Sequence, residues 1–279
     1  MAILPRHRPA SLWRPTLDRV LCAVDGSRGG AEAVREALAL APCATRLSFI
    51  AVHDDVGDGP EPVVSLAAHR ARQALEQAQA TAAARSIRAD VELADAADLA
   101  AALIERACAG TILVVGCHGE PHAGATTGPI ATALAGRAAG PLLVARAGAR
   151  ADATGPRILV AVDDSAGAGA LVELAGAIAA SCAGYVHLVH VQGRDYGSQT
   201  RHRLAELATT LIEQTGAEPV VDVARAGNVA AHVCQLAHDC DTSLVVVGRR
   251  SRPRAPALGP VGERIVHAAP CSVLVAPTA

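Results

Sequence analysis

The residues of this sequence best suited to binding a small ligand are acidic residues and glycines at the ends of short apolar runs. A first apolar run ends at Asp25, and a later one ends at Gly116, with Gly119 and Gly128 behind it. Glycines let the backbone approach a phosphate closely, and a helix that begins after the last glycine offers free N–H groups to an anion. Groups of this kind are able to bind an anion.

Composition excludes several kinds of catalysis. The 25 basic residues are all arginines, so Schiff-base chemistry and a lysine-dependent phosphate loop are ruled out. None of the usual zinc-ligand spacings occurs, and no nucleophile elbow is present. We therefore expect a binding protein without a metal site rather than an enzyme.

Charge and aromatic content also limit the partners. A net charge of -2 gives no field that would hold a polyanion or a membrane, and 1% aromatic residues supply no stacking platform for nucleic acid. The eight cysteines contain no CxxC pair, which favours reduced thiols and a cytoplasmic location. Residues 1–19 are expected to form a loose basic tail.

Internal repetition is the strongest feature of the chain, because three motifs of the first half recur in the same order in the second half. The matching pairs are 20–24 with 158–162, 111–116 with 243–248, and 128–130 with 259–261. Two copies of one domain therefore follow each other. We expect them at 20–146 and 157–279, joined by a short linker at 147–156.

In each copy, short apolar runs alternate with longer alanine-rich segments, a pattern typical of parallel strands buried on both faces and joined by helical crossovers. The expected strands are 20–25, 46–53, 87–93, 111–116 and 141–146, then 157–163, 185–192, 219–224, 243–248 and 272–276. The expected helices are 28–41, 63–86, 97–109, 128–139, 166–182, 198–216, 227–240 and 259–269. The predicted fold class is α/β, with two tandem doubly wound five-stranded parallel-sheet domains.

Ligands of doubly wound sheets lie outside the carboxyl ends of the strands. The candidate site residues at those ends are Asp25, Val52 and Gly116 in the first copy and Asp163, Val191 and Gly248 in the second.

Three motifs in the first copy carry a family resemblance. The sequences at 24–27 (VDGS), 50–53 (IAVH) and 115–119 (VGCHG) together resemble a universal stress protein domain, and 248–251 with 258–261 resembles it again. The resemblance covers both copies. It implies a tandem universal stress protein with an adenine nucleotide alpha hydrolase-like fold, a regulator of stress responses that binds ATP or a related adenine nucleotide.

The ATP-binding members of that family carry a glycine, two residues, a glycine, nine residues, and a glycine followed by Ser or Thr. The first copy keeps the three glycines but has eight residues in the gap and Pro129 after it. The second copy has Ser251 in place of the middle glycine, seven residues before Gly259, and then Pro260. Both copies therefore depart from the pattern, the second more than the first.

The proline has two interpretations. Pro129 removes one N–H and one hydroxyl, and hydrogen bonds to a charged group contribute about 1.5–3 kcal/mol each, so a ~µM site would weaken to ~mM. Alternatively, the proline simply starts a helix, where its missing N–H costs nothing.

The resemblance also implies roles for the other candidates, each with a structural alternative. Asp25 and Asp163 would lie near the ribose or base, or would instead cap the helices that follow. Val52 and Val191 would offer backbone groups to adenine. His118, between the two glycines, would lie near phosphate or would be a solvated loop histidine. The remaining candidates, at the start of the last helix of the first copy, are Pro129 and Ile130.

Four arginines follow the fourth strand of the second copy: Arg249, Arg250, Arg252 and Arg254. They would attract a phosphate or the acidic face of a partner, or would be a solvated loop.

Two functions stay open. The first is a regulator that binds an adenine nucleotide, mainly in the first copy, and slow ATP hydrolysis is the most enzymatic activity that the resemblance leaves open. The second is a nucleotide-free module that binds an unknown protein partner. The resemblance also implies that the last strand of each copy lies at a sheet edge and pairs with the same strand of a partner domain. The last strands here, 142–145 and 273–276, are apolar and uncharged, and such an edge left open promotes aggregation, so we expect them to pair with each other as an internal pseudo-dimer. A homodimer of whole chains is also possible.

Overall fold

The computed structural model describes residues 17–53, 66–108, 110–117, 128–147, 155–192, 198–250 and 258–278. Most of the expected tail and most of the expected linker lie outside these ranges.

The first repeat runs from the first to the fifth strand. Its elements are β1 (Leu17–Ala23), α1 (Arg28–Leu40), the 3-10 turn η1 (Ala41–Cys43), β2 (Ala44–His53), α2 (Leu66–Ala83), β3 (Asp90–Asp95), α3 (Leu99–Arg106), β4 (Thr111–Gly116), α4 (Pro129–Arg137) and β5 (Leu142–Ala145).

The second repeat has the same order of helices and strands. Its elements are β6 (Arg157–Val162), α5 (Ala168–Cys182), β7 (Tyr185–Gln192), α6 (Ser198–Thr215), β8 (Val220–Arg225), α7 (Val229–Asp239), β9 (Leu244–Arg250), α8 (Pro260–Ala268) and β10 (Ser272–Thr278).

Strand β3 begins later than the sequence predicts, since it was expected to begin at residue 87. Helix α2 instead ends in a closed turn, in which Ser86 has a φ of 59° and the N–H of Ile87 donates to the Ala82 carbonyl at 3.0 Å. This is the hydrogen bond of a Schellman motif, and it takes Ile87 out of the strand. The strand therefore begins three residues later, at Asp90.

Helix starts follow local sequence chemistry. Ser27, Asp98 and Asn228 each accept a backbone N–H with the side chain at the start of α1, α3 and α7. Helices α4 and α8 have no such side chain and begin with a proline after Gly128 and Gly259. Proline suits that first position, because its N–H would have no partner within the helix.

The ten strands form one sheet, in the order β3-β2-β1-β4-β5-β10-β9-β6-β7-β8. All neighbours within each repeat are parallel, and only β5 and β10 run antiparallel. The expected pairing of the two last strands is therefore confirmed.

We call the β5–β10 contact the seam. The paired residues across it are Val144 with Val273, Leu143 with Leu274, and Leu142 with Val275. Leu143 and Leu274 occupy equivalent positions in the two repeats, so the seam is symmetric about this central pair.

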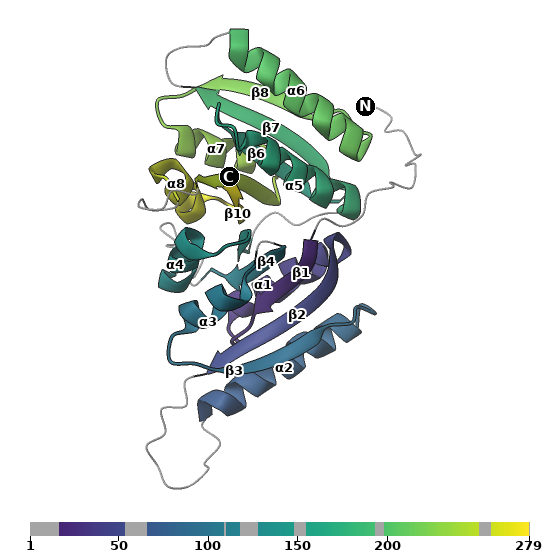
Figure 1. Cartoon of the computed structure of the whole chain (residues 1–279), viewed down its shortest axis with the longest axis vertical. Coiled ribbons are helices and arrows are strands. Elements are labelled where there is room, and N and C mark those ends of the chain that lie inside the picture. Colours follow the sequence, from purple (N-terminus) through teal and green to yellow (C-terminus); the bar gives the residue numbers. More distant parts are fainter. Residues whose placement is uncertain are drawn as a thin grey trace.

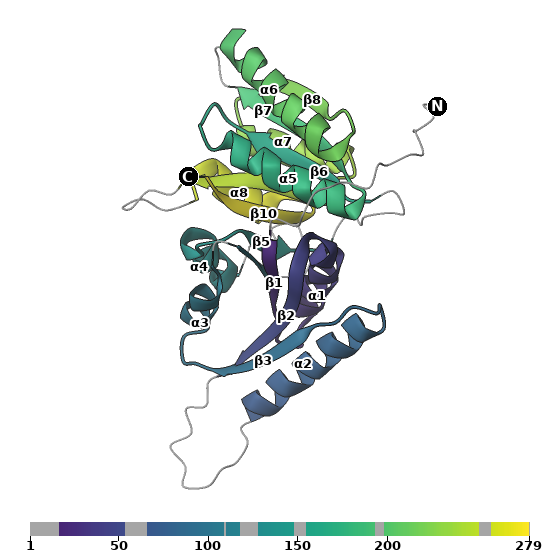
Figure 2. The ribbon, with the colours of Figure 1, turned by 45° about the vertical axis from the view of Figure 1, so that its right-hand side comes forward.

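Helices cover the sheet on both sides. One face carries α1, α2, α5 and α6, and the other carries α3, α4, α7 and α8 (Figure 1, Figure 2). Leu143 and Leu274 belong to the core beneath the first set, whereas Val144 and Val275 belong to the core beneath the second. Each core thus continues across the seam and includes buried residues of both repeats.

Two arginines add polar contacts between the repeats. Arg146, after β5, donates to the backbone carbonyl of His267 at 3.1 Å, at the end of α8. Arg249 of β9 donates to the Ala138 carbonyl at the end of α4. Cations stabilise helix C-termini, where carbonyl groups lack partners. Each repeat therefore caps a helix of the other.

None of the described helices has the length and apolar character needed to cross a membrane. The cytoplasmic location stays a prediction from the cysteine pattern.

Candidate functional site

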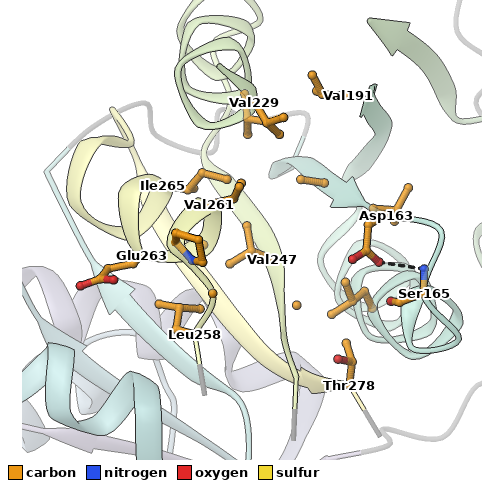
Figure 3. A pocket seen from close by; sticks show the side chains of 18 of the residues that line it. Asp163, Ser165, Val191, Val229, Val247, Leu258, Val261, Glu263, Ile265 and Thr278 are labelled. Atoms are coloured by element: carbon orange, nitrogen blue, oxygen red, sulfur yellow. Dashed lines mark hydrogen bonds between the residues drawn. The ribbon is translucent and has the colours of Figure 1, made fainter. Parts of the chain in front are cut away.

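The candidate site lies between two neighbouring strands whose connecting helices cover opposite faces of the sheet. Strands β6 and β9 are neighbours, with β7 beyond one and β10 beyond the other. Crossovers on opposite faces leave a crevice outside the carboxyl ends of such strands. In the second repeat this crevice is a cavity of 660 Å³ (Figure 3), within the range of small-molecule sites.

The cavity is mostly apolar. Its walls come from the ends of β6, β7 and β9, from α7 and from the start of α8. The apolar lining residues include Leu171, Val189, Val191, Val229, Val233, Val247, Leu258, Val261 and Ile265. All four second-copy candidates from the sequence line it: Asp163, Val191, Gly248 and Gly259.

Asp163 is an exposed carboxylate held at the cavity by a local turn. Its Oδ1 accepts the Ser165 backbone N–H at 3.0 Å, and both residues line the cavity on the β6 side (Figure 3). Asp25 makes the equivalent contact, accepting the Ser27 N–H at 2.9 Å and the Ser27 hydroxyl at 2.6 Å. Ser27 in turn caps α1. The residue that caps α1 is therefore Ser27, and Asp25 contacts this cap rather than serving as the cap itself.

The described lining residues carry negative but no positive charge. Asp163 and Glu263 are the charged residues among them, and they lie on opposite sides of the cavity (Figure 3). Glu263 is exposed and stands in the first turn of α8. The equivalent residue of the first repeat is Thr132, which is neutral and donates its hydroxyl to the Gly128 carbonyl at 3.2 Å.

Arg249 does not reach this cavity. It is buried in the seam region and engaged with α4, and its desolvation lowers the pKa of its guanidinium. Its place in a phosphate-attracting group is therefore wrong, because the side chain turns to the other repeat. Arg252 and Arg254 lie outside the described residues.

In the first repeat, Gly116 serves backbone packing. A Cβ on Gly116 would lie 2.4 Å from the carbonyl of Gly29, and one on Gly29 would lie 2.9 Å from the Cys117 carbonyl oxygen. The end of β4 therefore touches the first turn of α1 directly, and only glycines allow this approach. In the second repeat, Gly248 faces side chains instead, with Thr278 and Leu171 at 3.0 and 3.1 Å from a built Cβ.

The other first-copy candidates are placed only in part. Val52 lies half-buried at the end of β2, and Gly128, Pro129 and Ile130 begin α4. His118 and Gly119 lie outside the described residues. The structure therefore brings together the second-copy candidates, while the preference for the first copy stays a prediction.

Helices contribute lining residues that were not predicted from the sequence. Val229 and Val233 of α7, and Val261 and Ile265 of α8, face the cavity. Each pair has the i, i+4 spacing of one helix face, but that spacing equally describes a core face. Among the described residues, no group of three His, Cys, Asp or Glu side chains could hold a metal ion.

Two doubly wound domains that share one sheet, each with its own switch point, define a duplicated α/β protein. The universal stress protein family model matches residues 16–146 and again residues 156–277, so the chain belongs to that family.

Solved structures agree on the fold. A universal stress protein from Archaeoglobus fulgidus is 17% identical, with a TM-score of 0.72, and the match covers 94% of this chain and 96% of that one. A putative universal stress protein from Pseudomonas aeruginosa is 16% identical, with a TM-score of 0.66 and coverage of 94% and 93%. Among curated protein sequences, none matches this chain.

Proposed function

We propose that this universal stress protein binds an adenine nucleotide at the carboxyl ends of its strands and so acts as a nucleotide-dependent regulator. The observation that carries the proposal is the apolar cavity at the switch point of the second repeat, with Asp163 on its wall. The flat adenine ring can pack against the apolar lining of the cavity, and a carboxylate at a strand end can accept hydrogen bonds from ribose hydroxyls.

The two repeats differ at the helix start where the phosphates of a bound nucleotide would lie. At the start of α8, Val261 and Gly262 have N–H groups for an anion, whereas Pro260 has none. Glu263 opposes a phosphate there, since two unit charges about 6 Å apart near a protein surface interact by about 1–3 kcal/mol. Thr132 puts no charge at the equivalent place in the first repeat. We therefore assign ATP to the first repeat and a less charged adenine ligand to the second.

Titration calorimetry of the full chain with ATP, AMP and adenosine tests this assignment. Asp163→Ala should weaken AMP and adenosine about 10- to 100-fold, because hydrogen bonds to a charged group contribute about 1.5–3 kcal/mol. Asp25→Ala should weaken ATP in the same way. Asp164→Ala is the matched control, since this exposed neighbour of Asp163 does not line the cavity and should leave each affinity unchanged.

Glu263→Thr tests the charge argument separately. It gives the second repeat the residue of the first, so a second ATP site should appear or strengthen, by about 5- to 100-fold. If Asp25→Ala and Asp163→Ala leave all affinities unchanged, the assigned residues are wrong. If none of the three ligands binds to the wild-type chain, nucleotide binding itself is wrong.

The second candidate function is a nucleotide-free module that binds a protein partner. It is favoured by the two acids and the absence of any cation among the described lining residues of the cavity. The nucleotide content of the purified chain, released by denaturation and separated by chromatography, discriminates the two functions. Bound adenine nucleotide supports the first function, and a nucleotide-free chain that also fails the titrations supports the second.

A further inference from the structure

Two cysteines from different repeats meet beside the seam. Cys43 is the last residue of η1, and Cys182 is the last residue of α5, which packs against η1. Their sulfur atoms lie 3.3 Å apart. The two positions are 139 residues apart in the chain, so this contact exists only because the repeats pack together.

The two cysteines are equivalent in the two repeats. Cys43 lies four residues before Leu47, which pairs with Val20. Cys182 lies four residues before Val186, which pairs with Ile158, the counterpart of Val20 in the second repeat. A residue can touch its own counterpart only on the two-fold axis of a symmetric interface. The Leu143–Leu274 pair marks that axis in the sheet, and the cysteine pair marks it again in the helical layer on the α1 and α5 side.

We propose that Cys43 and Cys182 form a redox-active dithiol, which a hydroperoxide converts into a disulfide that links the two repeats. A disulfide needs an S–S distance of about 2.05 Å, so the sulfur atoms must approach by about 1.3 Å. Neither cysteine forms a disulfide, and the two sulfur atoms are already in contact. This proposal does not depend on nucleotide binding.

The two sulfur atoms differ in exposure and in hydrogen bonding, and therefore in their roles in the reaction. Cys43 is 2% exposed, whereas Cys182 is only partly buried, so an oxidant meets Cys182 first. The Cys182 sulfur also lies 3.3 Å from the Ala39 carbonyl oxygen, to which its thiol donates, and this leaves Cys43 as the donor to Cys182. Burial and the contact with Cys182 raise the pKa of Cys43. Cys43 therefore stays a thiol, and the more exposed Cys182 is the sulfur that reacts first with the oxidant.

The reaction balances with one hydroperoxide per pair. The Cys182 thiol loses its proton, and the resulting thiolate attacks one oxygen of hydrogen peroxide. The O–O bond breaks to give a sulfenic acid and a hydroxide ion, and the hydroxide takes up the proton from Cys182 to become the first water. The sulfur of Cys43 then attacks the Cys182 sulfur, and its proton leaves with the hydroxyl group as a second water. Two thiols lose two electrons in total, and hydrogen peroxide is reduced to two waters.

The bond would hold the repeats together independently of the seam. It closes a loop across both domains, and such a cross-link mainly constrains the unfolded chain. The oxidised protein should therefore unfold at a higher temperature than the reduced protein. The two halves should also stay together when the seam is weakened.

The test treats the full reduced chain with hydrogen peroxide, blocks the remaining thiols and separates the product by non-reducing electrophoresis. We expect a faster-migrating monomer, a mass lower by two hydrogen atoms, and a linked pair of peptides containing Cys43 and Cys182, all reversed by dithiothreitol. Cys43→Ser and Cys182→Ser should each abolish the faster band. Cys108→Ser, which removes an exposed thiol elsewhere, should leave it in place.

Two outcomes would overturn the proposal. One is a wild-type chain whose Cys108 is fully oxidised while peptide mapping finds no Cys43–Cys182 link. The other is a faster band that persists in Cys43→Ser. Because the mapping uses the wild-type chain, the test holds even if a serine variant fails to fold.

Discussion

Charges placed in the seam should separate the two repeats. We take the double variant Val144→Asp and Val275→Asp, which puts one carboxylate on β5 and one on β10. Both valines have 0% exposure, and both side chains belong to the core beneath α4 and α8. The seam is the only strand pairing between the repeats among the described residues, so it is the contact that these charges address.

The expected cost is large. Each substitution loses about 1.5–3 kcal/mol of apolar burial. An unpaired carboxylate left in the interior costs several kcal/mol more. Two such sites together equal or exceed the 5–15 kcal/mol that stabilises a typical domain. Separation of the repeats brings this sheet edge into water and relieves the penalty. Because about 1.4 kcal/mol is a tenfold change, the open form should dominate by orders of magnitude.

Small-angle scattering measures the result. The double variant should give a more extended particle than the wild-type chain, while far-UV circular dichroism keeps the signal of folded α/β domains. The matched control is Val91→Asp with Val220→Asp, the same change on the outer strands β3 and β8. Those valines are 45% and 61% exposed, so the control should scatter like the wild type.

An unchanged, compact particle that retains the circular dichroism signal would refute the reasoning. It would mean that contacts other than the β5–β10 seam hold the repeats together. Oxidation of the cysteine pair offers a second comparison, since it should restore a compact particle to the double variant.

Three further predictions concern packing and charge. Arg249→Met should lower the free energy of unfolding by about 1.5–3 kcal/mol in urea titrations, since it removes charged hydrogen bonds to α4. Gly116→Ala should cost about 1–3 kcal/mol through its backbone clash, while Gly136→Ala, with open space around it, should not destabilise. Burial raises the pKa of Glu36, so the folded state holds that proton more tightly than the unfolded state. The free energy of unfolding should therefore fall as pH rises from the pKa of this carboxyl in the unfolded chain to its higher pKa in the folded chain. Glu36→Gln should abolish that fall.

The amino-acid sequence determined the order and type of the elements. Apolar runs, alanine-rich segments and their duplication are local or repetitive features, and they predicted both five-stranded halves. The pairing of 142–145 with 273–276 was predicted from the family resemblance together with the apolar, uncharged character of both strands. The second-copy candidates Asp163 and Gly259 were found in the same way, from their places at the ends of elements.

Only the tertiary structure decided which side chains meet across the repeats. The sequence shows Cys43 and Cys182 as two separate cysteines, and nothing in their spacing indicates a 3.3 Å contact. Arg249 stood in an arginine-rich stretch that suggested phosphate, yet packing turned it to a helix end of the other repeat. Such contacts depend on the symmetry of the assembled halves. Local sequence carries no information on that symmetry, because it arises only when the two sheets join.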